Sequence, residues 1–304
     1  MTIGRYAPSP SGRLHIGNLR TALLAWLAAR AESGSLLLRI DDLDIATSRP
    51  EHEQTQRDDL AALGLSFDSE ARQSSHGDLY REAIATLDKR GLLYPCFCSR
   101  REIREATVAP HDHLPDGAYP GTCRELSVAD RHRRAAERPA ALRVRAGGEN
   151  VSFNDLVAGP FVGTVDDFVV SRNDGAPAYN LATVVDDHHL GVTQVLRGAD
   201  LLVGTPRQVW LRRQLGLGEI SHAHVSLMVN ADGDRLAKRD GAVTLPDLEA
   251  LGYGPLAVRN KLAASIGLIG HGESATLDEL VELFNFATLS SEPTVFTNPD
   301  DQTI

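Results

Sequence analysis

Residues 5–26 read RYAPSPSGRLHIGNLRTALLAW, and this stretch decides how the chain begins to fold. Pro8 and Pro10 each hold φ at about −65° and bias the preceding residue toward extended backbone, so a helix cannot begin before Gly12. Beyond Gly12, leucines recur at helical spacing, at positions 14, 19, 23, 24 and 27. The stretch therefore predicts an extended segment, a turn and then a buried amphipathic helix.

Two polar residues stand in or near the first turn of this predicted helix. His15 and Asn18 lie where unpaired backbone N–H groups and the positive end of the helix dipole favour anions. Taken alone, the sequence Pro-Ser-Gly before a helix fits an ordinary loop as well as a phosphate-facing site, because short motifs also match by chance.

The composition is that of an ordinary soluble globular protein, with 24% charged and 42% apolar residues. Its 304 residues suffice for one large domain or roughly two to three ordinary ones. We expect a cytoplasmic protein with no membrane contact, since no run of about 18 apolar residues and no signal-peptide pattern is present. Three cysteines are too few for a disulfide framework.

The net charge of −10 argues against broad coating by nucleic acid, but arginines gather locally. Each of two blocks is either a solvated helix face or a footprint for RNA. The first block holds Arg131, Arg133, Arg134, Arg138, Arg143 and Arg145, and the second holds Arg207, Arg212 and Arg213.

Strand patterns at residues 3–6 and 36–40 flank the first helix and predict a βαβ unit of a parallel sheet. The second strand is followed by Asp41, Asp42 and Asp44. Ligands of open parallel sheets bind beyond the carboxyl ends of the strands, so these acids stand at the expected functional edge.

The hydrophobic periodicity of the remaining chain predicts further helices and strands. Helices are expected at 51–63 and 77–89, and an inserted module without periodicity at 94–123, followed by short strands at 142–145, 151–153 and 161–165. The parallel sheet is expected to resume with strand 168–171, helix 179–187, strand 192–196, helix 205–215 and strand 224–228, before helices at 255–266 and 277–284. The predicted units are 1–93 and 166–229 (halves of one domain), 94–165 (the insertion), 230–290 (a loop and helices) and 291–304 (a disordered tail).

Two further sequence patterns resemble binding motifs, but we do not predict a binding site at either. Residues 270–275 match a dinucleotide-binding pattern, but they follow a predicted helix where that fingerprint requires a strand. The run DDHH at 186–189 cannot turn four ligands to one metal, because only helix positions three or four apart share a face. We expect a helix end with polar contacts there.

The loop ADGDRLAKRDG at 231–241 brackets a cationic segment with glycines. Lys238 carries a compact charge on a flexible stem, which suits a triphosphate whose charge shifts during reaction. Together, PSGRLHIG at 10–17 of the first βα turn and RLAKR downstream resemble the HIGH and KMSKS signatures of class I aminoacyl-tRNA synthetases. The stretches RYAPSPSG, RIDDLD, AYNL and VLRGAD narrow the resemblance to the glutamyl branch, over residues 4–268.

The resemblance implies an α/β fold: a doubly wound parallel (Rossmann-like) catalytic domain with a small zinc-binding insertion and a short C-terminal helical region. Glutamyl-tRNA synthetases continue into a sizeable anticodon-binding region, whereas this chain stops soon after the loop. It thus resembles the truncated members, which attach glutamate to the queuosine base of tRNA(Asp). The alternatives are an enzyme that charges a tRNA 3′ end and a non-catalytic paralogue that binds RNA or an amino acid.

The family's reaction implies ATP, L-glutamate, queuosine-bearing tRNA(Asp) and Mg²⁺ as partners of a chain that we expect to be monomeric. The glutamate carboxylate attacks the α-phosphorus of ATP, and positioning and charge stabilisation dominate catalysis. His15 and Lys238 are the predicted catalytic residues. The predicted ATP-binding residues are His15, Gly17, Asn18 and Lys238.

For glutamate, Arg5 and Arg197 suit its carboxylates and Asp41 its ammonium. The full predicted set is Arg5, Tyr6, Ala7, Pro8, Ser9, Asp41, Tyr179 and Arg197. Two residues depart from the family pattern, which has Glu where Asp41 stands and a second His where Asn18 stands.

The insertion holds Cys96, Cys98 and Cys123, three soft ligands for a structural zinc, which prefers four. From residue chemistry alone, His111 or His113 would be the fourth. The family pattern C-x-C…Y-x₃-C instead names Tyr119, which we follow. The remaining alternative is a set of three reduced structural cysteines.

Overall fold

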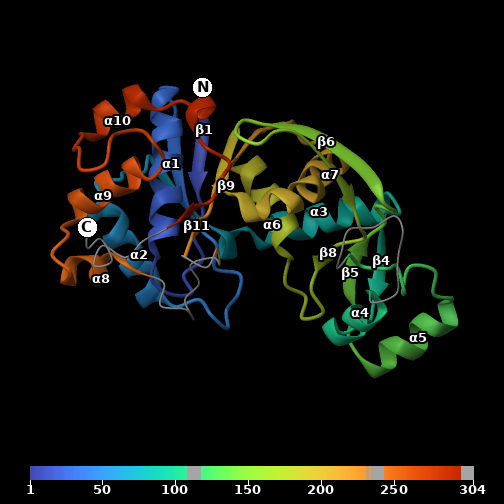
Figure 1. The fold of residues 1–304 in the computed structure, drawn as a ribbon. Helices are drawn as coiled ribbons and strands as arrows, with labels where there is room; N and C mark the ends of the chain where they lie inside the picture. Colours follow the sequence, from blue (N-terminus) through green and yellow to red (C-terminus); the bar gives the residue numbers. More distant parts are fainter. Residues whose placement is uncertain (108–117, 231–232, 234–242, 296–304) are drawn as a thin grey trace.

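The computed structural model describes residues 1–107, 118–230, 233 and 243–295 (Figure 1). Strands β1 (Ile3–Tyr6), β2 (Ser35–Ile40) and β3 (Ser69–Arg72) form a parallel sheet. Helix α1 (Ile16–Ala31) connects β1 to β2, and α2 (Pro50–Ala62) connects β2 to β3. The predicted βαβ unit is confirmed, and the sheet extends by β3, which has no clear strand pattern.

A second parallel pair, β9 (Gln194–Gly198) and β10 (Ser221–Val225), lies on the other side of β1. The amide of Thr193, just before β9, donates to the carbonyl of Ile3 at 2.9 Å. The 3₁₀ segment η2 (Ala199–Gly204) and helix α7 (Thr205–Leu215) connect β9 to β10. The result is a Rossmann-like α/β arrangement built on parallel strands.

The insertion has more regular structure than its sequence pattern predicts. Strands β4 (Leu93–Cys96), β5 (Ala141–Val144) and β8 (Val169–Ser171) form an antiparallel sheet. Helices α4 (Arg100–Thr107) and α5 (Val128–Glu137) stand beside this sheet, at the end of the molecule remote from α1 (Figure 1). The expectation of an irregular module over 94–123 is therefore wrong where β4 and α4 form, and residues 108–117 lie outside the described part.

The expectation that strand 168–171 rejoins the parallel sheet is also wrong, because β8 pairs with β5 of the insertion. Alternating side chains identify a strand but not its partner. The chain returns to the parallel sheet only through α6 (Tyr179–His189) and β9. Helix α3 (Gly77–Lys89), preceded by the 3₁₀ segment η1 (Gln73–His76), packs against α6 and α7.

The long hairpin β6 (Glu149–Asp155) and β7 (Gly159–Val165) arches from the insertion back to the main body (Figure 1). Its first strand ends beside β10, where Asp155 pairs in parallel register with His222. The hairpin therefore connects the insertion physically to the parallel strands.

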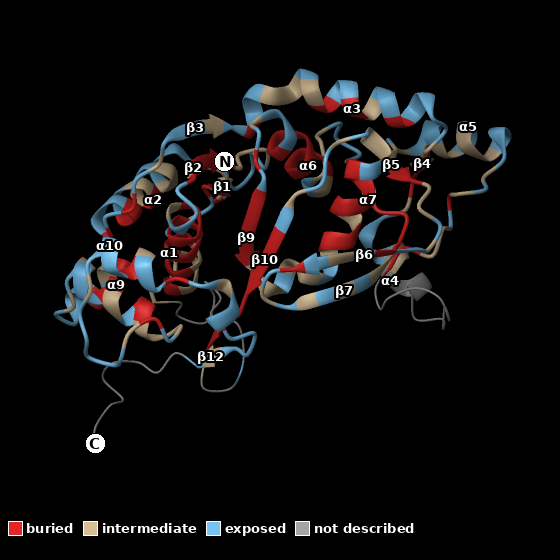
Figure 2. Ribbon diagram, turned by 90° about the horizontal axis from the view of Figure 1, so that it is seen from above, coloured by how far each residue is buried: buried red, intermediate tan, exposed pale blue. Residues whose placement is uncertain are grey.

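Helix α1 is buried on nearly every side, not on one face as an amphipathic helix would be (Figure 2). Helices α9 (Pro255–Ala264) and α10 (Leu277–Leu283) pack on α1, and α8 (Leu245–Ala250) packs on α9. The C-terminal helices thus complete the N-terminal core. The sequence pattern predicted an amphipathic helix with one buried face, and it did not predict that these helices would cover the other faces of α1.

The expectation of a disordered tail over 291–304 is wrong at its start, where β12 (Thr294–Val295) pairs with β11 (Met228–Val229) after the 3₁₀ segment η4 (Phe286–Thr288). Residues 296–304 lie outside the described part. Among the described residues, no helix has the length and apolar character needed to span a membrane.

Candidate functional site

A cavity of about 650 Å³ opens where β1, β2 and β9 end and α1 begins. It brings together all the predicted glutamate- and ATP-binding residues that the structure describes: Arg5, Tyr6, Ala7, Pro8, Ser9, His15, Gly17, Asn18, Asp41, Tyr179 and Arg197. Lys238, the remaining member, lies outside the described residues. Motifs that are far apart in the sequence thus line one space.

The first turn of α1 is capped by two of these residues. The Nδ1 atom of His15 accepts from the amides of Gly17 at 3.1 Å and Asn18 at 3.4 Å, and the Asn18 side chain accepts from the His15 amide at 3.3 Å. This reciprocal capping box leaves the proton of a neutral His15 ring on Nε2. A Cβ at Gly17 would lie 3.0 Å from the His15 ring, so glycine makes room for the cap.

A buried ion network lies beside the predicted glutamate-binding residues of the cavity. One oxygen of Asp187 is 2.6 Å from Nη1 of Arg39 and 3.4 Å from Nε of Arg5. Although burial raises the pKa of Asp187, Arg5 and Arg39 lower it below its ordinary value. The Asp187 carboxylate is therefore charged and organises two arginines.

Asp41 is held by Arg39 rather than standing alone. Its two oxygens lie 2.7 Å from Nε and 3.2 Å from Nη2 of Arg39. Burial raises the pKa of Asp41, and Arg39 opposes that shift. Sequence reasoning missed Arg39 and Asp187, although Arg39 belongs to the RIDDLD stretch that supports the family resemblance.

The DDHH run at 186–189 ends α6, as expected, and its acids make polar contacts. Asp186 accepts from Gln73 at 2.7 Å and from Tyr80 at 2.8 Å, and it lies 2.8 Å from Nδ1 of His76. Helix α9 ends at Ala264 and a turn, not a strand, leads to Gly270, so the structural condition of the dinucleotide-binding pattern is not met.

Arg197 on β9 is buried and fully hydrogen-bonded along one edge. Its Nε lies 3.0 Å from Nε2 of His224, and its Nη2 donates to the Thr205 hydroxyl at 2.8 Å. Its Nη1 donates to the hydroxyl of Tyr179 at 3.3 Å. Within the described part of the chain, none of these partners is a carboxylate, which leaves Arg197 suited to bind one from a ligand.

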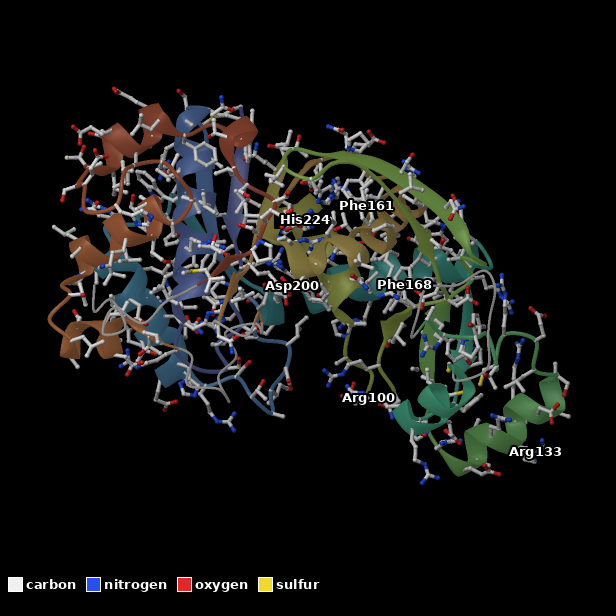
Figure 3. All side chains as sticks on the ribbon, viewed as in Figure 1. Arg100, Arg133, Phe161, Phe168, Asp200 and His224 are labelled. Atoms are coloured by element: carbon white, nitrogen blue, oxygen red, sulfur yellow. The ribbon has the colours of Figure 1, made fainter. Side chains whose placement is uncertain are left out.

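A second cavity of about 870 Å³ separates the parallel sheet from the cysteine module and shares Ser9, Asp41 and Tyr179 with the first. Arg100 lines it, and Figure 3 shows Arg100 on the side of the insertion that faces the N-terminal body. Two binding spaces therefore adjoin at the same three residues.

The arginine blocks separate in three dimensions. Arg131, Arg133 and Arg134 lie on α5, which buries no residue, and Figure 3 shows Arg133 pointing away from the body. Arg143 is buried, with its guanidinium carbon 3.7 Å from the centre of the Tyr119 ring. The exposure of these α5 arginines fits a solvated helix face and an RNA footprint alike, so both alternatives stay predictions.

The cysteine module converges on one point. The sulfurs of Cys96, Cys98 and Cys123 lie within 4.8 Å of one another. The Tyr119 hydroxyl is 3.3 Å from the sulfur of Cys96 and 3.6 Å from that of Cys98. Tetrahedral zinc with Zn–S bonds of about 2.3 Å needs sulfurs in this range, so the three cysteines are compatible with a zinc ion, and Tyr119 stays the predicted fourth ligand. His111 and His113 lie outside the described residues.

Residues 2–300 match the family model for the catalytic domain of class I tRNA synthetases, E and Q. The chain is 52% identical, over 97% of its length and 93% of the relative, to a glutamyl-Q tRNA(Asp) synthetase of Nocardia farcinica. It is 38% identical to a glutamate–tRNA ligase of Syntrophotalea carbinolica, but it spans only 63% of that relative.

The fold is similar to the crystal structure of a glutamate tRNA ligase from Elizabethkingia meningosepticum in complex with its amino acid. The TM-score is 0.82 at 26% identity, with 97% of this chain and 67% of the ligase covered.

Proposed function

Because this chain belongs to the family of class I tRNA synthetases for glutamate and glutamine, we propose that it activates L-glutamate with ATP and transfers it to the queuosine base of tRNA(Asp). One observation carries this assignment: 52% identity extends along 93% of a glutamyl-Q tRNA(Asp) synthetase, whereas the chain covers 63% of a glutamate–tRNA ligase. The chain is an aminoacyl-tRNA synthetase-type ligase.

Activation joins a glutamate carboxylate oxygen to the α-phosphorus of ATP and breaks the bond to the β-phosphate, so pyrophosphate leaves. The N-terminus of α1 would hold phosphate oxygens, and His15 would donate to them from Nε2. Asn18 keeps His15 in place through the capping box. Lys238 would neutralise the departing pyrophosphate, and Mg²⁺ supplies further charge neutralisation when ATP is bound.

Glutamate would bind between Arg5 and Arg197, whose guanidinium groups match its carboxylates. Tyr179 and Ser9 would add hydrogen bonds, and residues 6–8 would form the backbone wall of the site. Asp41 would accept from the substrate ammonium while remaining bonded to Arg39, which fixes the direction of its carboxylate.

Transfer would use the second cavity, since it meets the first at Ser9, Asp41 and Tyr179. A hydroxyl of the queuosine cyclopentenediol attacks the glutamyl carbonyl carbon, an ester forms, and AMP leaves. We propose a cytoplasmic location because the tRNA substrate is there. A monomeric state stays a prediction.

The test is incubation with ATP, radiolabelled glutamate and one of three RNAs: tRNA(Asp) with queuosine, tRNA(Asp) without it, or tRNA(Glu). Label should appear only on queuosine-containing tRNA(Asp), and periodate oxidation of the diol beforehand should prevent it. Label at the 3′ adenosine of tRNA(Glu) would favour the charging enzyme. Absence of both transfer and ATP–pyrophosphate exchange would favour the non-catalytic paralogue.

The convergence of three sulfurs and the Tyr119 hydroxyl supports a structural zinc site. Cys96, Cys98, Cys123 and Tyr119 would hold the ion, which would fix the loop around β4 to the segment around Cys123. Such a site would stabilise the insertion and take no part in adenylate formation.

A further inference from the structure

Arg197 lines the cavity, and two buried side chains behind it, His224 and Asp155, form a hydrogen-bonded series that ends at its guanidinium group. Its neighbour His224 stands beside it in the register of β9 and β10. Behind His224 lies Asp155, at the end of β6, with its Oδ2 2.6 Å from Nδ1 of the ring. Both His224 and Asp155 side chains are completely buried. Figure 3 shows His224 in the middle of the molecule, where the main body meets the insertion.

Asp155 is an unusually well-anchored carboxylate. Its Oδ1 accepts from the amides of Val157, Ala158 and His224 at 3.0, 2.9 and 3.1 Å. Although burial raises its pKa, the hydrogen bonds from His224 and from these amides lower the pKa of Asp155 to about 2. A charged carboxylate can only accept, so Nδ1 of His224 must carry a proton.

The pKa of His224 lies below its ordinary value, because burial lowers it. The hydrogen bond to Asp155 raises this pKa in part, and the nearby charge of Arg197 lowers it further. The ring is therefore neutral, with its proton on Nδ1 and a lone pair on Nε2. That lone pair faces the Arg197 Nε–H at 3.0 Å. The Thr205 hydroxyl accepts from Nη2 of Arg197 at 2.8 Å and lies 3.0 Å from both the Leu201 carbonyl oxygen and Nε2 of His224. Arg197 and Thr205 therefore both contact the Nε2 lone pair, and the Leu201 carbonyl offers the Thr205 proton a second acceptor.

These bonds decide which edge of the guanidinium meets a ligand. His224 and Thr205 take the Nε/Nη2 edge. The opposite Nη1/Nη2 end, beside the Tyr179 hydroxyl, is then the edge with donors for a bidentate carboxylate. Rotation of the guanidinium would exchange these edges and lose that geometry.

We infer that Asp155 and His224 are positioning residues for glutamate: Asp155 fixes the tautomer of His224, and His224 orients Arg197 toward the substrate carboxylate. The inference rests on the proposed function, because it needs Arg197 to bind glutamate. It also implies that docking of the β6–β7 hairpin onto β10 sets the affinity for the amino acid.

A matched pair of substitutions at position 224 separates the two ends of the ring. His224→Asn keeps a donor near the place of Nδ1 for Asp155 but removes the acceptor for Arg197. His224→Gln keeps an acceptor near the place of Nε2 but removes the donor to Asp155. In glutamate-dependent ATP–pyrophosphate exchange, we expect His224→Asn to raise the KM for glutamate about 10-fold to 100-fold, with kcat and the KM for ATP nearly unchanged. His224→Gln should stay within about 5-fold of the wild-type KM.

Asp155→Asn provides a second test that does not touch position 224. Its carbonyl oxygen would keep the three amide bonds and turn its NH₂ toward Nδ1, which moves the ring proton to Nε2, against the Arg197 Nε–H. The KM for glutamate should rise as in His224→Asn. In an Arg197→Ala background, His224→Asn should change the KM by no more than about 2-fold, because the coupling is lost.

The melting temperature of every variant is recorded, so that loss of fold is not mistaken for loss of binding. A merely structural pair would give the reverse order, with His224→Gln more damaging than His224→Asn. Such an order, or a wild-type KM in both His224→Asn and Asp155→Asn, would overturn the inference. If the wild-type protein shows no exchange with glutamate, the proposed function fails and this inference falls with it.

Discussion

At the scale of single residues, the site depends on Asp187, a buried carboxylate to which we assign no contact with substrate. Asp187 joins Arg5 and Arg39, and Arg39 in turn holds Asp41. Each arginine in this network would be costly in a buried site without its acid, because an uncompensated buried charge loses hydration. The arginines to which we assign glutamate binding thus require an internal counter-charge.

Asp187→Asn should lower the free energy of unfolding by about 3–5 kcal/mol, since it removes one partner of a buried ion pair. Urea denaturation measures the effect. The matched control is Asp130→Asn on α5, whose partner Arg133 is exposed, and it should change the free energy far less. Equal losses in the two variants would contradict the network's role.

The direction of the pKa shift adds a pH signature to the same variant. The folded protein lowers the pKa of Asp187, so the unfolded chain binds the proton more readily. The stabilisation is present above the ordinary aspartate pKa and is lost as pH falls through the lower, folded-state pKa. Wild-type stability should therefore fall more steeply on acidification than that of Asp187→Asn.

Substrate choice is also decided by single residues. With glutamine bound, one of the guanidinium groups of Arg5 and Arg197 would face a neutral amide, and a site with unpaired polar groups rejects such analogues. Glutamine should be activated at least ~10³-fold less efficiently than glutamate in ATP–pyrophosphate exchange. Comparable kcat/KM values for the two amino acids would refute the proposed carboxylate recognition.

At the scale of elements, the first turn of α1 serves both the fold and the chemistry. Its cap is the same His15 that we assign to phosphate binding, and it works only because Gly17 leaves space for the ring. The buried surroundings of α1 keep this turn rigid, since α9 and α10 cover the helix on its outer side. A rigid, capped N-terminus is a suitable anion site.

The two roles of His15 can be separated by substitution. His15→Asn supplies a side-chain oxygen near the place of Nδ1 and should keep the stability of the wild type, whereas His15→Ala should lose about 1 kcal/mol of it. Both variants lack Nε2 and should form glutamyl-adenylate ~10²–10³-fold more slowly. Thermal unfolding and exchange kinetics are the readouts. Wild-type exchange in His15→Asn would restrict His15 to capping.

At the scale of the whole molecule, the cysteine module has its own small core. Tyr94, Cys96, Phe97, Tyr119 and Cys123 pack together, apart from the large core around α1. The hairpin β6–β7 connects the insertion to β10 and so links the two ends of the molecule. Damage at the proposed zinc site should therefore affect the insertion, beside which we propose that transfer to tRNA takes place, before it affects the proposed adenylation site.

The protein should bind about one zinc ion per chain, and Cys98→Ser should abolish binding, because three ligands hold structural zinc poorly. We expect faster proteolysis of the insertion in that variant and a larger loss of transfer to tRNA than of ATP–pyrophosphate exchange. Metal analysis of Tyr119→Phe and of a His111→Ala/His113→Ala double variant identifies the fourth ligand. Zinc-free protein from zinc-replete cells would refute the site.

Local patterns in the sequence determined much of this protein. Helices at 77–89 and 205–215 have the predicted bounds, and the first βαβ unit forms as expected, because periodicity and turn residues act within a few positions. The motifs around Arg5, His15, Tyr179 and Arg197, interpreted through the family resemblance, identified residues that share one cavity.

Only the tertiary structure decided what these residues contact. The pairing of β8 with β5, the burial of α1 by C-terminal helices and the strand β12 depend on partners far away in the chain. The same holds for Asp187 between Arg5 and Arg39 and for Asp155 behind His224. The protonation state and orientation of a buried charge or ring depend on the donor or acceptor that it contacts. Folding brings that partner from a distant part of the sequence.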